Sequence, residues 1–379
     1  MSNFLKSKNT LRMPKPLAIQ LGVLATLLMV SGLSQAATVY TEGDKSLNIG
    51  MGMLTSINKG SGNKLSLDDV RLYSSGKISK DYGFTFNMAR DTGAGADQMR
   101  VLDAIGQIEI FPTLNVWVGQ FLPPSDRQNL NGPYYSSASP SAFGVGLQAG
   151  YPAKFKGRDV GAAVWGDIEK FKYQLGVFSG SPKSSATAPN ANKDPMYAAR
   201  LSYAFMDAEP GYYTSGTYYG SKDVATIGLT WQHQSNAYGT AAQPSDFTGL
   251  SLDLLLEKKL DGSAAATLEG GYSKFDLGNN LVVGPTTYGV AYYSAPYQGT
   301  SWFVQPAYYT GVKIGSGVLQ PYVKYTNNTP DAGFGTASNQ TDVGVGYLIK
   351  GYDTRVFFNY ATPSGGANSV SSLALQLQF

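Results

Sequence analysis

The feature that most constrains this chain is a two-residue alternation of apolar and polar side chains, which recurs in segments of about ten residues through nearly the whole sequence. The last segment shows it most clearly, because Leu373, Leu375, Leu377 and Phe379 alternate with small or polar residues. Successive side chains of a strand point to opposite faces, so each segment has one apolar and one polar face. A tilted strand needs roughly 9–11 residues to cross a bilayer. We therefore predict an all-β, membrane-spanning protein.

Sixteen such segments follow one another, separated by turn-forming Gly, Asn, Asp, Pro and Ser. We place them at 47–56, 68–78, 82–91, 99–110, 114–121, 158–167, 170–179, 196–206, 223–234, 248–258, 263–275, 301–311, 317–327, 340–349, 353–361 and 371–379. The connections between them alternate between short and long, as in transmembrane barrels. We predict an antiparallel barrel of sixteen strands. A single further strand near 288–293 would make the number odd, so we assign 276–300 to an outer loop and keep eighteen strands as the alternative. The connection 207–223 is long where the alternation predicts a short turn.

The composition fits a closed barrel better than a soluble or helical membrane protein. Charged residues make up 15% of the chain, whereas soluble domains usually carry about 25%. After the N-terminal segment there is no long apolar run of the kind a spanning helix requires. Without Cys and with a single His, the chain has no thiolate or multi-histidine metal site. We predict no cofactor.

The first 36 residues have the pattern of a secretory signal peptide. Basic side chains precede an apolar run at 17–30, which is followed by the small-residue site 34–36. We predict that 1–36 is removed and that 37–379 forms the barrel in the outer membrane. Four of the 29 basic residues and none of the 26 acidic residues lie in the predicted signal. The remaining chain is nearly neutral, which gives no support to nucleic-acid binding.

With the apolar face of each strand toward lipid, the opposite face lines the lumen, where charged side chains stay hydrated. The predicted basic lining residues are Arg71, Lys77, Lys172, Arg200, Lys324 and Arg355. The predicted acidic lining residues are Asp103, Glu109, Asp253, Glu257, Glu269 and Asp342. A balanced lining predicts weak charge selectivity. Three of the acids lie on two neighbouring strands, at 248–258 and 263–275, so we also predict a field across the pore.

The longest connection, at about 122–157, is a candidate constriction element. It carries Asp126 and Arg127 together with several aromatic residues. We predict that it folds inward and that Arg127 faces the solute. The alternative is a cap at the surface that does not enter the lumen.

Four stretches resemble the outer-membrane porins related to the phosphate-selective porin family. They are Val116–Pro124, Glu209–Tyr213 with Gly216–Asp223, Leu319–Tyr325 and the terminal strand ending in Phe379. The resemblance implies a sixteen-stranded barrel that forms a homotrimer, with the loop after Phe121 folded inward. It also implies that Phe379 is read by the outer-membrane assembly machinery. In the selective members, phosphate preference is tied to a ladder of inward arginines and a lysine-rich region.

One local pattern suggests a different class of protein. His233 and Ser235 share a strand face, and this spacing resembles the His-x-Ser of outer-membrane phospholipase and lipid A deacylase. Catalysis also requires a third residue that orients the histidine, and the sequence offers no clear candidate. We therefore predict that the protein is not an enzyme, with a lipid hydrolase as the alternative.

We predict passive diffusion of small hydrophilic solutes or ions through a water-filled pore across a Gram-negative outer membrane. The outer face of the barrel is then in contact with the lipid bilayer. An anion- or phosphate-selective porin is compatible with the same sequence patterns, and so is a non-conducting sheath for a partner protein.

Overall fold

The structure is a computed structural model that describes residues 37–60, 64–91, 97–142, 155–180, 194–239, 242–278 and 298–379. The chain divides into the units Met1–Ser31 and Gly32–Phe379, and every described residue belongs to the second unit. The predicted signal peptide, residues 1–36, lies outside the described residues. Within the described ranges, no helix has the length and apolar character needed to cross a membrane.

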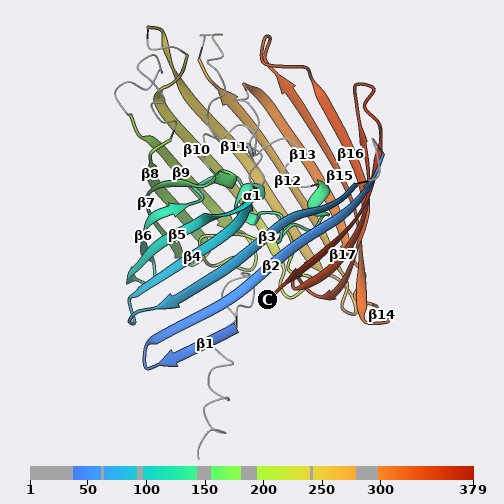
Figure 1. Ribbon diagram of the computed structural model, residues 1–379, viewed down its shortest axis with the longest axis horizontal. Coiled ribbons are helices and arrows are strands. Elements are labelled where there is room, and N and C mark those ends of the chain that lie inside the picture. Colours follow the sequence, from blue (N-terminus) through green and yellow to red (C-terminus); the bar gives the residue numbers. More distant parts are fainter. Residues whose placement is uncertain are drawn as a thin grey trace, which may run out of the picture. The chain divides into compact units, whose positions relative to one another are not determined.

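Sixteen antiparallel strands form a closed barrel, which confirms the predicted fold class (Figure 1). The barrel strands are β2 (Lys45–Lys59), β3 (Lys64–Lys77), β4 (Tyr82–Asp91), β5 (Gln98–Phe111), β6 (Leu114–Phe121), β7 (Asp159–Ile168), β8 (Phe171–Phe178), β9 (Met196–Ala204), β10 (Val224–Gly239), β11 (Pro244–Lys259), β12 (Ala265–Asp276), β13 (Gly299–Tyr309), β15 (Gly317–Pro330), β16 (Ser338–Lys350), β17 (Thr354–Pro363) and β18 (Val370–Gln378). Each strand pairs with the next one along the chain. The barrel closes where β18 pairs with β2, for example Leu375 with Thr55.

The alternative of eighteen barrel strands is wrong, because β12 pairs directly with β13. The segment around 288–293 that suggested a further strand lies outside the described residues. Two additional short strands, β1 (Ala37–Glu42) and β14 (Lys313–Ile314), stand outside the ring of sixteen.

Strand β1 lies along the same edge of β2 that receives β18. Ala37 pairs with Ile49 of β2, whereas β18 pairs with β2 from residue 52 onward. Phe379, which follows β18, exchanges two backbone hydrogen bonds with Met51, at 3.0 and 3.1 Å. The first described strand and the end of the chain therefore lie end to end on one edge, with only Gly50 between their partners on β2.

The alternation along each strand separates an apolar outer face from a polar inner face. On β18, Leu373 and Leu377 are exposed, whereas Ala374 and Gln376 are buried. On β10, Leu229 is exposed and its neighbour Thr230 is fully buried. Soluble proteins usually bury the apolar side chains instead. This reversed arrangement is the one that transmembrane barrels have, with lipid outside and polar groups inside.

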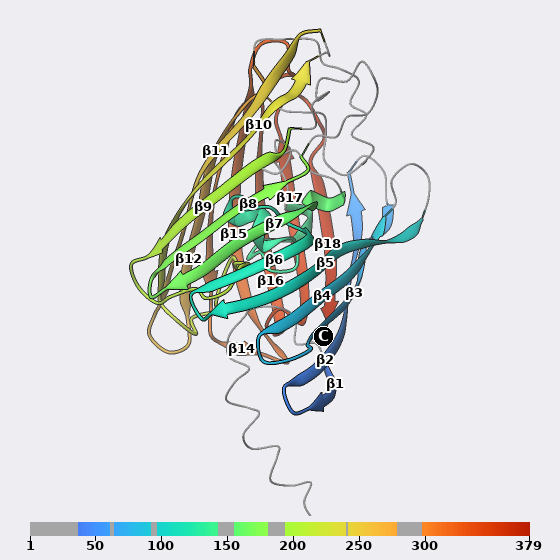
Figure 2. The ribbon, with the colours of Figure 1, turned by 90° about the vertical axis from the view of Figure 1, so that its left-hand side faces the viewer.

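Short connections, among them β3–β4, β5–β6 and β7–β8, gather at one end of the barrel, which we call the turn end (Figure 2). The tightest turns use residues with positive φ, such as Glu169 between β7 and β8 (φ 55°) and Gly351 between β16 and β17 (φ 48°). One connection at this end is long: it runs from β9 to β10 and enters the barrel.

Candidate channel interior

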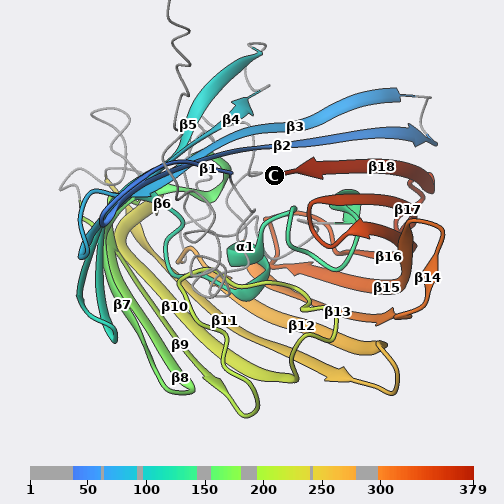
Figure 3. The ribbon, with the colours of Figure 1, turned by 90° about the horizontal axis from the view of Figure 1, so that it is seen from below.

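Two segments that connect barrel strands lie inside the barrel. The first, the inner loop, comprises residues 122–142 and contains α1 (Arg127–Asn131), whose five residues are all buried. The second, the inner turn, comprises residues 207–223 between β9 and β10. The two segments meet where Gly216 N donates to Tyr135 O at 2.8 Å, and Figure 3 shows α1 within the ring of strands. The connection 207–223 is long, although a short turn was expected, because it enters the barrel.

Arg127 joins the inner loop to the inner turn and to the barrel wall. Its Nη1 donates to Glu209 Oε1 and to Ser215 O, both at 2.9 Å, and its Nη2 also binds the Glu209 carboxylate. The Arg127 backbone N–H donates to Asp253 at 3.0 Å, and Asp253 is paired with Arg200. Arg127 is only 1% exposed. The structure therefore places the side chain that was expected to face the solute in a buried ion-pair network.

Asp126 begins α1. Its side chain accepts a hydrogen bond from Asn129 N at 3.1 Å, which is the usual contact of a helix N-cap. Asp126 is buried, so this predicted constriction residue orients the helix within the inner loop.

Two of the predicted lining acids bind the inner segments. Glu257 accepts hydrogen bonds from Thr217 Oγ1 at 2.7 Å and from Gly220 N at 2.8 Å, both in the inner turn. Glu269 accepts one from Asn131 Nδ2 of the inner loop at 3.0 Å. These buried acids lie on neighbouring strands, as the sequence predicts, and they hold both segments against β11 and β12.

Three of the predicted basic residues donate to backbone carbonyls of the same segments. Arg355 donates to Ser136 O at 2.7 Å and to Tyr134 O at 2.8 Å. Lys324 donates to Ala142 O at 3.0 Å. Lys172 donates to the backbone oxygens of residues 209 and 211 in the inner turn. All three are buried, so their charges support the inner segments.

The remaining predicted lining residues have three different surroundings. Lys77 and Glu109 are exposed near the turn end, where Lys77 Nζ donates to Lys80 O at 3.2 Å. Asp342 is buried and accepts from Asn359 Nδ2 at 2.9 Å. Arg71 and Asp103 line an open space next to the inner loop.

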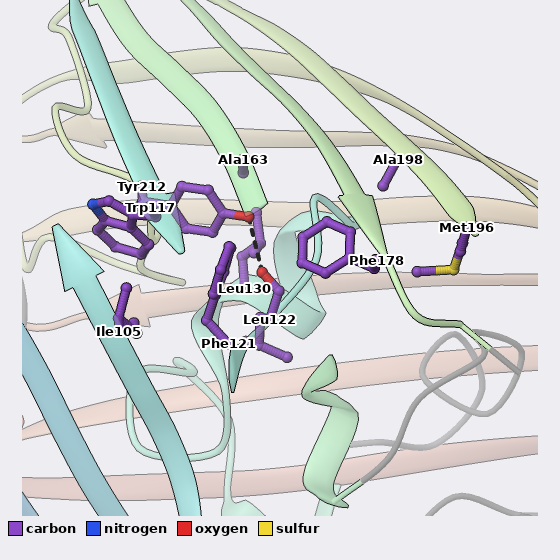
Figure 4. Packing of buried hydrophobic residues seen from close by; sticks show 10 residues of the cluster. All are labelled: Ile105, Trp117, Phe121, Leu122, Leu130, Ala163, Phe178, Met196, Ala198 and Tyr212. Atoms are coloured by element: carbon purple, nitrogen blue, oxygen red, sulfur yellow. Dashed lines mark hydrogen bonds between the residues drawn. The ribbon is translucent and has the colours of Figure 1, made fainter. Parts of the chain in front are cut away.

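An apolar cluster fastens the inner turn to the wall formed by β6, β7 and β8. The ring of Tyr212 stacks on Trp117 with 4.6 Å between centroids, and it meets Phe121 edge-on. The Tyr212 hydroxyl donates to Leu122 O at 2.8 Å, the dashed line in Figure 4. This contact joins the turn, the wall and the start of the inner loop.

The open space is a cavity of about 120 Å³ between the β3–β5 wall and the two inner segments. Arg71 lies beside Asp69, with 2.6 Å from Nε to Oδ2, and Lys156 binds the other oxygen of Asp69. Arg158 Nε lies 3.0 Å from Asp103 Oδ1. The inner segments thus contact the side formed by β8–β13, β15, β17 and β18, and the cavity lies against the β3–β5 wall.

The sequence prediction did not select Glu209, Tyr212, Asp69 or Arg158. The unexpected length of 207–223 is the one sequence signal that points to the first two residues. A connection that is too long for a tight turn can fold back into the barrel and contact its interior. Asp69 has the same strand phase as Arg71, two residues away. Arg158 immediately precedes β7, and no pattern in the sequence marks it.

The geometry at His233 does not assemble a nucleophile and a base. His233 Nδ1 lies 3.1 Å from Thr248 Oγ1, and the ring stacks on exposed Trp231 at 5.9 Å between centroids. No hydrogen bond joins His233 to Ser235, both of which are described. A hydrolase of this type needs that contact.

No family model and no curated protein sequence matches this chain. Solved structures do. An anion-selective porin from Comamonas acidovorans is similar at 13% identity and TM-score 0.59, over 89% of this chain and all of that one. The trimer form of OmpT, an outer membrane protein of Vibrio cholerae, is similar at 11% identity and TM-score 0.56, over 89% and 100%. Salmonella typhi OmpF is similar at 10% identity and TM-score 0.55, over 90% and 100%. The fold is that of the outer-membrane porins.

Proposed function

We propose that this protein is an outer-membrane porin through which small hydrophilic solutes or ions diffuse passively. The observation that carries the proposal is the closed barrel of sixteen strands, which is apolar outside and polar inside. Only a barrel or a helix satisfies its backbone hydrogen bonds within lipid. The exposed apolar side chains of the strands are then the surface that meets the bilayer.

The inner loop and inner turn supply the constriction in this proposal. They are held to β8, β11, β12, β15 and β17 by the buried charges described above, so the remaining passage follows the β3–β5 wall, where the cavity lies. Solutes are selected there by size. Five charged side chains gather beside it, Arg71, Lys156 and Arg158 against Asp69 and Asp103. A surplus of one positive charge gives a weak preference for anions.

The phosphate-selective alternative is less well supported. Arg200 is paired with Asp253, and Lys324 and Arg355 donate to backbone carbonyls. Basic side chains engaged in this way do not form a ladder of free donors along the passage. We propose that any anion preference arises at the cavity.

Planar-bilayer recording tests the channel directly. Purified, folded protein should give stepwise conductance in KCl, and a salt gradient should give a small reversal potential of the sign for anion preference. Folded protein without channels would refute the proposal. The cutoff for neutral sugars then measures the size of the constriction.

The assembly and export steps are also proposals. One structural neighbour is described in a trimer form, and we propose a homotrimer for this chain, to be checked by mass measurement in detergent. We propose cleavage of the signal before Ala37, which N-terminal sequencing of the exported protein tests. Phe379, exposed and paired with β2, is the proposed recognition residue for the assembly machinery.

We propose that the protein is not an enzyme. The contact of His233 with Thr248 supports this against the lipid hydrolase. Acyl release from lipid by the folded protein, abolished in Ser235→Ala, would overturn it. A sheath around a partner protein is disfavoured because the chain's own segments already occupy part of the lumen.

A further inference from the structure

The cavity beside β3–β5 is lined by charged, polar and apolar side chains. Its charged lining residues are Arg71, Arg158 and Asp103. Its apolar lining includes Leu102, Leu122 and Leu130, together with the rings of Tyr135 and Tyr213. A passage for hydrated ions needs no such apolar lining, because ions that keep their water shells make no favourable contact with it.

Asp103, which lines the cavity, and Asp69, which lies beside it, already accept hydrogen bonds from neighbouring side chains. Asp69 accepts from Arg71 Nε on one oxygen and from Lys156 Nζ on the other. Asp103 accepts from Arg158 Nε at 3.0 Å and from Asn87 Nδ2 at 2.9 Å, again one on each oxygen. Neither carboxylate therefore needs a cationic ligand.

The guanidinium groups, in contrast, have donors to spare. A guanidinium carries five N–H donors. Arg158 uses Nε for Asp103 and Nη1 for Lys156 O at 2.7 Å, and its Nη2 has no acceptor among the residues that the structure describes. Arg71 uses Nε for Asp69 and also forms a hydrogen bond with the Tyr73 side chain, and its guanidinium lies over the ring of Tyr134 at 4.7 Å. The charged residues that line the cavity, Arg71, Arg158 and Asp103, leave one positive charge in excess.

We propose that this cavity binds small monocarboxylates with an apolar body, an inference that rests on the proposed channel function and names its preferred solute class. The carboxylate accepts N–H bonds from Arg158 and Arg71, since a guanidinium matches the two oxygens of a carboxylate. The apolar body lies against Leu102, Leu122 and Leu130 and is removed from water. Both halves are required, so phosphate and formate, which lack the apolar body, bind weakly.

The test uses benzoate as the probe on wild-type channels in bilayers. Benzoate added to one side should block the KCl current reversibly and in proportion to its occupancy of the site. Formate and phosphate, which test the apolar lining, and neutral benzamide, which tests the charge, should each bind about tenfold more weakly. Equal block by benzoate and formate, or by benzoate and benzamide, would overturn the proposal.

Variants locate the site. Arg158→Gln should weaken benzoate block by about tenfold while KCl conductance persists. Arg100→Gln is the matched control. It also removes one positive charge, but Arg100 lies on β5, pairs with Asp91 and does not line the cavity. Loss of block in both variants alike would place the effect in the general field of the pore and overturn the site.

Titration calorimetry of the detergent-folded protein with benzoate separates this proposal from the channel. Heat of binding without conductance would uphold the site and refute the porin. Conductance without benzoate binding, by either method, would uphold the porin and refute the site. Because the benzoate, formate and benzamide comparison uses the wild-type chain, it stands even if Arg158→Gln does not fold.

Discussion

The pair Arg127–Glu209 predicts how the constriction is held. Glu209 lies in the inner turn and accepts from Arg127 Nη1 at 2.9 Å and from the Tyr218 hydroxyl at 2.7 Å. Glu209→Gln keeps the shape and removes the charge, so Arg127 is left buried without its main partner. Losing one partner of a buried pair costs about 3 kcal/mol, which is roughly a 100-fold change in the ratio of docked to released inner loop.

Single-channel recording measures this change. Wild-type protein should show one steady conductance, and Glu209→Gln should add brief, larger openings. The double variant Arg127→Met with Glu209→Gln should be closer to wild type than Glu209→Gln alone, because no unpaired charge then remains buried. Asp261→Asn, in an exposed turn at the same end of the barrel, is the control for the loss of a carboxylate. A Glu209→Gln record that matches wild type would refute the reasoning.

The same pair predicts a pH dependence. Burial raises the pKa of Glu209, but the Arg127 charge, with hydrogen bonds from Arg127 and Tyr218, more than reverses this and lowers the pKa to about 2. A lowered folded-state pKa means that the pair's contribution is present above the ordinary value of 4.5 and is lost as the pH falls from there through about 2. The conductance of wild-type channels should therefore be constant from neutral pH down to about pH 5. Larger openings that appear well above that pH would contradict the assignment.

Three further outcomes are expected. Burial lowers the pKa of Lys156 to about 8 despite Asp69, so its positive charge is lost as the pH rises through that value. The anion preference in the reversal potential should fall between pH 7 and 9, and a Lys156→Gln channel should show a flat profile. Tyr212→Ala removes the ring stacked on Trp117, at a cost of about 3 kcal/mol, and should expose the inner turn to proteolysis from the turn end. Deleting Phe379 removes two backbone bonds to β2 and should lower the yield of inserted barrel on heat-modified gels, whereas an unchanged yield would exclude it as the assembly signal.

The sequence predicts the wall of this protein far better than its interior. The side of the wall on which a strand residue lies can be predicted, because successive side chains alternate between the two faces of a strand. The positions of Asp253 and Glu257 on inward phases could therefore be predicted, and so could their neighbouring strands. What they contact could not be predicted, because it depends on two segments that return into the lumen.

Arg127 illustrates the limit. Its partner Glu209 is 82 residues away in the chain, and no periodicity relates a loop to a turn at the opposite end of the barrel. The prediction that Arg127 faces the solute assumed an empty lumen around the loop. Once the inner turn occupies that space, the strongest available contact for the guanidinium is a buried carboxylate.

The strand β1 has a consequence for how the cylinder closes. A β-sheet seam can in principle shift by two residues without moving any side chain to the wrong face, and such a shift would change the tilt and the bore of the whole ring. Here the path in one direction is occupied, since the final residue of the chain would run into Ala37 after passing Gly50. A shift of β18 in the other direction would leave backbone N–H and C=O groups of β2 without hydrogen-bond partners. Strand β1 therefore blocks a shift of the seam in one of its two directions.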